Sequence, residues 1–135
     1  TLELERKREK GELNPEERLA LESNEETIRQ RAEVCRQLVN VGAKLVGGSD
    51  CGWGAYPFGE FHKELDAMIQ IGMSTEQAFM SGTKHAAESL GLSDKIGTIE
   101  AGKEADLLLV EGDPTHNIND LGNVLAVFRY GARVC

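Results

Sequence analysis

The chain has 135 residues, 40% of them hydrophobic, which is enough to bury the core of one domain or of parts of two. Its formal net charge of −8 at pH 7 argues against nucleic acid or an anionic membrane as a partner, because phosphate binding needs clustered lysine and arginine. The basic residues Arg6, Lys7, Arg8 and Lys10 are interleaved with glutamates, so we expect them to form a solvated helix face.

The cysteines bear on the cellular compartment. Cys35, Cys51 and Cys135 contain no CxxC pair, and any disulfide scheme leaves one of them unpaired, as in a reducing compartment. No apolar run reaches the roughly 18 residues of a membrane span, and no signal peptide opens the sequence. We therefore expect a cytoplasmic protein with no membrane partner.

The first third of the chain predicts exposed helices. Residues 1–33 hold 17 of the 38 charged residues, with mixed signs. Asn14 is a favourable N-cap followed by Pro15 at the first helical position, and Ser23 with Glu26 predicts a second helix start through a capping box. One apolar helical face follows, with Gly42 as the residue after the helix; it consists of Ile28, Ala32, Cys35 and Val39.

The segment AKLVGGSDCGWG, residues 43–54, follows this helix. Its apolar residues Ala43, Leu45 and Val46 predict a buried strand, and the two glycines after them allow a bend. Asp50 would then lie at the carboxyl end of a strand, where α/β proteins usually place their chemistry. The alternative is an ordinary turn in which the Asp50 carboxylate binds backbone N–H groups.

Helices and then strands are predicted after this segment. Helical spacing indicates a helix from about 60 to 71, Ser74 and Gln77 form a capping box for the next helix, and a further helix covers 83–90. The pattern changes near Ser93. Residues 96–99, 105–110 and 124–130 are predicted strands, the first two joined by a turn at 100–103.

Several motifs in fixed order carry a family resemblance: GSD after an apolar segment, EFHKEL, TKHAAESLGL, and IGTIEAGKEADLLLVEGDP. Together, over roughly residues 24 to 135, they resemble the C-terminal part of metal-dependent amidohydrolases, in the branch with imidazolonepropionase-like and Xaa-Pro dipeptidase-like enzymes. The resemblance implies an α/β fold in which 1–93 are the C-terminal portion of a (β/α)8 barrel and 94–135 are strands of a small β-sandwich. Because a complete barrel takes about 250 residues, the chain would be a fragment or one part of a split protein.

The resemblance also implies the chemistry: hydrolysis of a C–N bond in a small amide, cyclic amide or dipeptide by metal-activated water, with one or two divalent ions, zinc being expected. Asp50 matches the aspartate that binds the metal and exchanges a proton with the bound water. His62 matches a place where some relatives have a substrate-binding histidine. The family's HxH, carboxylated lysine or glutamate, and two further histidines have no counterpart here, so the chain alone is expected to be inactive.

Other candidate residues have structural interpretations. His85 stands where relatives usually have asparagine and is expected to pack or hydrogen-bond between helix and barrel, while His116 is expected on the surface. Cys51 is expected to be a small buried substitute for alanine, or else a thiol beside the metal. Asp106, in the GKEADLLL run, is expected to bind backbone N–H groups and fix a hairpin.

Two functional interpretations remain open at this point. The chain is part of an enzyme with a small-molecule amide or dipeptide substrate, or it is a non-catalytic remnant that acts only in association with another chain. In both cases the run Leu107 to Val110, apolar on both faces, predicts self-association or pairing with the missing N-terminal part.

Overall fold

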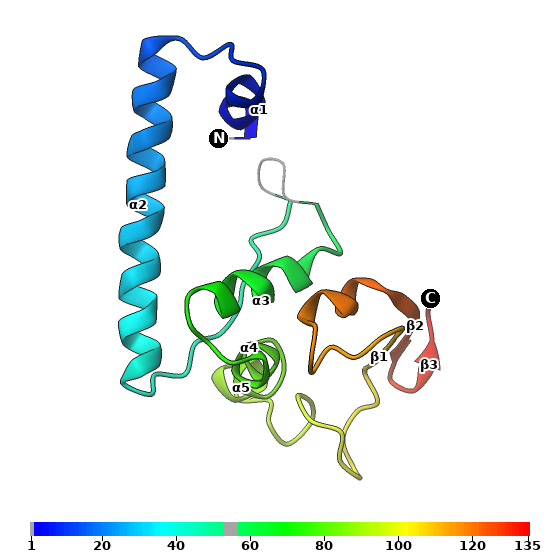
Figure 1. Ribbon diagram of the computed structural model, residues 1–135. Helices are drawn as coiled ribbons and strands as arrows, with labels where there is room; N and C mark the ends of the chain where they lie inside the picture. Colours follow the sequence, from blue (N-terminus) through cyan, green and yellow to red (C-terminus); the bar gives the residue numbers. More distant parts are fainter. Residues whose placement is uncertain (1, 53–56) are drawn as a thin grey trace.

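The computed structural model describes residues 2–52 and 57–135, which form five helices, a short 3₁₀ helix and a small sheet in chain order (Figure 1). The α-helices are α1 (Leu2–Glu9), α2 (Pro15–Asn40), α3 (Phe61–Gln70), α4 (Thr75–Ser81) and α5 (Lys84–Ser89). The strands and the 3₁₀ helix are β1 (Leu107–Val110), η1 (Ile118–Gly122), β2 (Val124–Arg129) and β3 (Ala132–Arg133).

Helix α2 begins and ends as the sequence predicts. The Asn14 side chain accepts a bond from the Glu17 N–H at 2.8 Å, and the Glu17 carboxylate accepts from the Asn14 N–H at 3.0 Å, which completes a capping box. At the other end Gly42 has φ of 80°, and its N–H donates to the Val39 carbonyl. The predicted second start is wrong, because Ser23 lies inside the continuous helix and its carbonyl accepts from the Thr27 hydroxyl.

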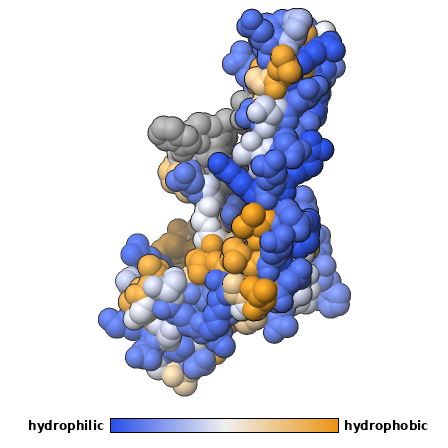
Figure 2. Space-filling view, turned by 90° about the vertical axis from the view of Figure 1, so that its left-hand side faces the viewer, coloured by the Kyte–Doolittle hydropathy of each residue, from blue (hydrophilic) through white to orange (hydrophobic). Residues whose placement is uncertain are grey.

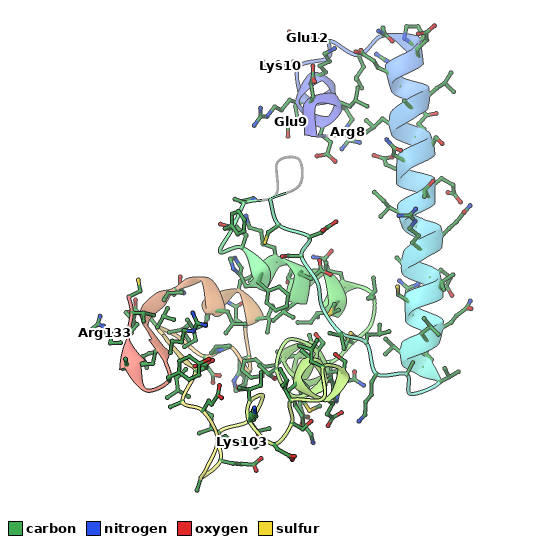
Figure 3. The ribbon with its side chains drawn as sticks, turned by 180° about the vertical axis from the view of Figure 1, so that it is seen from behind. Arg8, Glu9, Lys10, Glu12, Lys103 and Arg133 are labelled. Carbon is green, nitrogen blue, oxygen red and sulfur yellow. The ribbon has the colours of Figure 1, made fainter. Side chains whose placement is uncertain are left out.

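Helices α1 and α2 form a hairpin whose upper part stands away from the rest of the molecule (Figure 1). Leu21 is 5% exposed, and ion pairs of 2.5 Å join Lys7 to Glu17 and Arg8 to Glu25. At the end of α1 and in the turn after it, Arg8, Glu9, Lys10 and Glu12 lie close together (Figure 3). Arg6, Arg8 and Lys10 are exposed and Lys7 is partly exposed, in agreement with the predicted solvated face.

Helices α3 and α4 and the 3₁₀ helix η1 supply most of the main core. The buried residues are Leu65, Met68, Met73, Ala78 and Ile118, and partly buried apolar residues that pack against them are Val39, Leu45, Phe61, Ile69 and Leu121. The predicted capping box of α4 is confirmed, since the side chain of Ser74 accepts from the Gln77 N–H and the Gln77 side chain accepts from the Ser74 N–H.

The strands form an antiparallel sheet in the order β1-β2-β3, with β1 at an edge. Leu107 pairs with Phe128 and Leu109 with Ala126, and the register shifts between Leu109 and Val110. Asp106 accepts a bond from the Tyr130 N–H at 2.8 Å, where Tyr130 has φ of 50°. This confirms that the Asp106 carboxylate binds a backbone N–H group, but the predicted hairpin between 96–99 and 105–110 is wrong: the bond joins the start of β1 to the end of β2.

Two predicted strands are absent from the described residues. Residues 43–46 have no strand pairing, and Val46 is 43% exposed; residues 96–98 form a bend, and Ile99 belongs to no regular element. The physical reason is that a strand requires a neighbour for its backbone hydrogen bonds, and within 2–52 and 57–135 no strand lies beside either segment. No helix in this part of the chain is long and apolar enough to cross a membrane.

Candidate functional site

The candidate site is the turn that carries Asp50. The segment before it leaves the core at Leu45, which packs against the buried cluster of the helical body. Asp50 itself is exposed and has φ of 49°, a left-handed conformation that is uncommon outside glycine. An exposed carboxylate on a turn anchored to a core can accept a proton or contact a cation.

Two phenylalanine rings flank this turn. A Cβ built on Gly47 would lie 3.1 Å from Cζ of Phe61, and one built on Gly52 would lie 3.2 Å from Cζ of Phe58. Both glycines are therefore in close contact with an aromatic ring, one on each side of Asp50. Sequence reasoning missed these contacts, because Gly47 and Phe61 are far apart in the chain and neither belongs to a recognisable spacing.

The structure places His62 at the start of α3, between that helix and η1. Its side chain is 14% exposed, its Nε2 lies 3.8 Å from Glu60 Oε2, and a Cβ on Gly122 would lie 3.1 Å from its Cε1. Lys63 donates a hydrogen bond to the Glu60 carboxylate and thereby lowers the pKa of Glu60, with nearby His62 acting in the same direction. In the described part of the chain, no hydrogen bond or ion pair joins His62 to Asp50.

His85 is a half-buried residue of α5 with an unusual ring atom. Its Nδ1 is buried and has no hydrogen-bond partner within the described residues. The expected packing role agrees with this partial burial, but the expected hydrogen bond is not formed at Nδ1. A buried ring nitrogen without a hydrogen-bond partner costs free energy, so His85 in this position lowers the stability of the fold.

The other candidates lie on the surface. The His116 side chain is 84% exposed and its Nδ1 lies 2.8 Å from Asp113 Oδ2, which confirms the surface assignment. The expectation that Cys51 is buried is wrong, because it follows Asp50 on the exposed turn. Lys103, by contrast, is only 15% exposed; it lies beside the yellow loop at the bottom of Figure 3 and donates a hydrogen bond to the Thr98 hydroxyl.

The residues present do not by themselves form a metal site. A carboxylate oxygen such as that of Asp50 suits a divalent ion, but a stable site takes three or more protein ligands. Within residues 2–52 and 57–135, no group of three or more His, Cys, Asp or Glu side chains is close enough to share an ion. Any further ligands would have to come from other polypeptide.

Comparison with known proteins settles the family. The amidohydrolase family profile matches residues 3–134, almost the whole chain. This chain belongs to the amidohydrolase family. The imidazolonepropionase of Syntrophobacter fumaroxidans is 30% identical over 87 residues, which are 64% of this chain and 20% of that protein.

Solved structures agree with this assignment. A Xaa-Pro dipeptidase with bound methionine in its active site is 35% identical with a TM-score of 0.70, over 76% of this chain and 25% of that one. Phenylurea hydrolase B is 28% identical with a TM-score of 0.67, over 74% and 26%. The chain therefore spans about a fifth of the length of the curated relatives and about a quarter of the solved ones.

Proposed function

We propose that this amidohydrolase chain is the C-terminal part of a longer enzyme that hydrolyses C–N bonds in small amides, cyclic amides or dipeptides. The family match over residues 3–134 supports the proposal, as do relatives that are imidazolonepropionases, a Xaa-Pro dipeptidase and phenylurea hydrolase B. In this proposal residues 1–93 belong to a (β/α)8 barrel and residues 94–135 to a β-sandwich domain. The partial coverage of these relatives supports a role as one part of a longer chain.

The observation that carries the proposal is the position of Asp50. Its carboxylate is exposed at the tip of a turn whose preceding segment packs on the core, and its left-handed backbone sets it apart from an extended linker. We propose that Asp50 is a ligand of a divalent ion, zinc being the expected metal, and accepts a proton from the attacking water. Such an ion, when bound with its other ligands, makes water more acidic and polarises a carbonyl group.

His62 has a more limited role in the proposal. Its ring is packed against Gly122 and lies near Glu60, so only part of it can reach a substrate. We propose that it borders the substrate pocket of the complete enzyme. A histidine held in this way would orient a substrate group through one ring nitrogen, while its contacts with Gly122 and Glu60 hold the ring in place.

A non-catalytic role is the alternative, and one observation favours it. Apolar side chains remain exposed on α2 and on the sheet, among them Ile28 at 62% and Leu125 at 53%. Apolar side chains gather beside the lower part of the long helix on the face seen in Figure 2. A remnant that acts only by association with another chain would use such surfaces.

We further propose a cytoplasmic location and no nucleic-acid partner. The three cysteines Cys35, Cys51 and Cys135 are free thiols, which fits a reducing compartment. The net charge of −8 opposes binding to phosphate backbones.

The experiment that tests the proposed function replaces Asp50 by Asn in the longer polypeptide that contains this chain. Asparagine keeps the size of the side chain but removes the charge and the basic oxygen. The rate constant for amide hydrolysis should fall by about 100-fold or more while the fold survives, which is the scale of lost acid–base catalysis. Asp94→Asn, an exposed aspartate of the turn after α5, is the matched control and should leave the rate unchanged. Near-normal turnover of Asp50→Asn would overturn the assignment of Asp50.

A further inference from the structure

We propose that Phe61 is a positioning residue whose ring fixes the turn that carries Asp50. The inference rests on the proposed role of Asp50, because it states what holds that carboxylate in place. Phe61 begins α3 and is half-buried beside the main core, so its own position is set by the helical body.

The ring lies between two glycines from different parts of the chain. A Cβ on Gly47 would be 3.1 Å from Phe61 Cζ, and a Cβ on Gly82 would be 2.7 Å from Phe61 Cε1. Both distances are shorter than an ordinary carbon–carbon contact of about 3.5–4.0 Å. Any larger residue at either position would displace the ring or the backbone.

These contacts connect the Asp50 turn to the helical body. Gly82 lies at the end of α4, and Gly47 lies three residues before Asp50. The 43–50 segment has no strand pairing, so its position depends on side-chain contacts, which are the ion pair of Lys44 with Glu88 at its start and apolar packing further on. The ring of Phe61 supplies that packing close to the turn, and Leu45 supplies it further back.

The ring on the other side of the turn is a weaker support. Phe58 contacts Gly52 but is 79% exposed, so solvent covers most of its surface. Displacing an exposed ring costs little, because it can move into water. Phe61 is therefore the residue whose replacement should move Asp50.

The chain offers a matched pair of glycines for the test. Gly47 and Gly48 are neighbours, and neither has a positive φ, so the backbone of both accepts alanine. Nothing lies within 4 Å of a Cβ built on Gly48, whereas one on Gly47 meets the Phe61 ring. The same substitution should thus disturb the turn at one position and spare it at the next.

The experiment compares Gly47→Ala and Gly48→Ala in the ¹⁵N,¹³C-labelled chain by NMR. A strong intraresidue HN–Hα NOE marks the positive φ of Asp50, and it requires neither metal nor substrate. Gly47→Ala should weaken this NOE and shift the resonances of residues 49–52 several-fold more than Gly48→Ala does. The resonances of Ala87 in α5 and Ala126 in β2 report whether the remaining fold is intact.

Two further variants separate positioning from a general loss of packing. Gly82→Ala should shift residues 49–52 through the ring, although Gly82 is distant in sequence. In a Phe61→Leu background the smaller side chain leaves room for a Cβ. Gly47→Ala and Gly82→Ala should then lose most of their effect on the turn. Equal effects of Gly47→Ala and Gly48→Ala, or unchanged effects of Gly82→Ala after Phe61→Leu, would overturn the proposal.

Failure of this inference and failure of the proposed function give different results. If Phe61 does not position the turn, Asp50→Asn still lowers turnover by about 100-fold or more in the longer protein, while the NMR comparison shows no difference. If Asp50 has no catalytic role, the NMR comparison holds while Asp50→Asn retains its rate.

Discussion

The helical body and the sheet bury their apolar side chains to very different extents. In α3 and its neighbours Leu65 is 3% exposed and Met68 8%, whereas in the sheet Leu108 is 48% exposed and Leu125 53%. The two regions have similarly apolar sequences, so the difference lies in what covers them. The helical body makes a core from its own elements, whereas in the described residues the sheet has no further strand beside either of its edge strands, β1 and β3.

Helix α2 has both covered and exposed apolar side chains along one face. Leu21 is buried beneath α1, and Val39 packs against the core of the helical body, while Ile28 between them is 62% exposed. The apolar stripe predicted from sequence, which runs from Ile28 to Val39, is therefore covered at its Val39 end and exposed at Ile28. Burial thus follows the presence of a packing partner and not the hydrophobic pattern alone.

The largest expected effect comes from the buried leucine of the helical body. Leu65→Ala should lower the free energy of unfolding by about 2–5 kcal/mol, since it leaves a cavity in a closed core. Leu108→Ala in the half-exposed strand should cost less than about 1 kcal/mol. Chemical denaturation of both variants measures the contrast, and equal costs would show that the two regions are buried alike in solution.

The next effect concerns the free edge of β1. Successive residues of a strand direct their backbone N–H and C=O groups to opposite sides. Ala105 and Glu111 bond toward β2, since the Ala105 carbonyl accepts from Gly131 N–H and Glu111 N–H donates to the Asn123 carbonyl. Leu108 and Val110 therefore direct their backbone groups away from β2. An uncharged edge of this kind pairs readily with another strand. We propose that the isolated chain self-associates through this edge.

Leu108→Lys tests the edge, because a charge on an exposed strand opposes edge-to-edge pairing. Sedimentation at increasing concentration should show association of the parent chain, weakened about tenfold or more by Leu108→Lys. Leu19→Lys, an exposed leucine on α2, is the control and should change little. A monodisperse parent chain that unfolds cooperatively as a monomer would contradict self-association.

Sequence motifs predicted the structure correctly where the contacts that they require lie within a few residues of the chain. The capping boxes at Asn14 and Ser74 involve residues three positions apart, and both are confirmed. The backbone bond expected of Asp106 is formed, but to Tyr130, a distant residue at the end of β2. The strand predicted at 43–46 failed because a strand depends on a neighbour that the sequence of the segment does not encode. Ser23 failed as a helix start because the residues before it continue the helix.

The candidate site was predictable only in part. The turn at Asp50 was located from GSD after an apolar run, yet its support by Phe61 depends on packing between distant segments. The same limitation applied to Cys51, whose exposure depends on the course of the turn. The family was predictable because its motifs keep a fixed order, and the match over residues 3–134 confirms it.

The smallest expected effect is the pH dependence of one surface ion pair that joins the 43–46 segment to α5. Lys44 Nζ lies 2.7 Å from Glu88 Oε2, and this hydrogen bond lowers the pKa of the Glu88 carboxyl below its ordinary value of 4.5. A lowered pKa in the folded state means that the pair stabilises the fold above pH 4.5 and loses this contribution as the pH falls further.

Lys44→Met should therefore reduce stability slightly at neutral pH and make no difference in acid, below the lowered pKa. Thermal unfolding of the parent chain and of Lys44→Met across this pH range measures the difference in stability, with Lys95→Met, an exposed lysine of the turn after α5, as the control. A stability difference that stays constant, or grows, on acidification would contradict its assignment to the Lys44–Glu88 ion pair.

The central claim is that the chain supplies one ligand, Asp50, to a metal site that other polypeptide completes. A measurement of zinc binding by the isolated 135-residue chain tests this claim most directly. Because Asp50 has no cluster of further ligands in the described residues, calorimetry should detect only weak binding without defined stoichiometry, and amide substrates should not be turned over. Tight binding of one zinc ion per chain, lost in Asp50→Asn, would show that the chain builds a complete metal site by itself and would contradict this account.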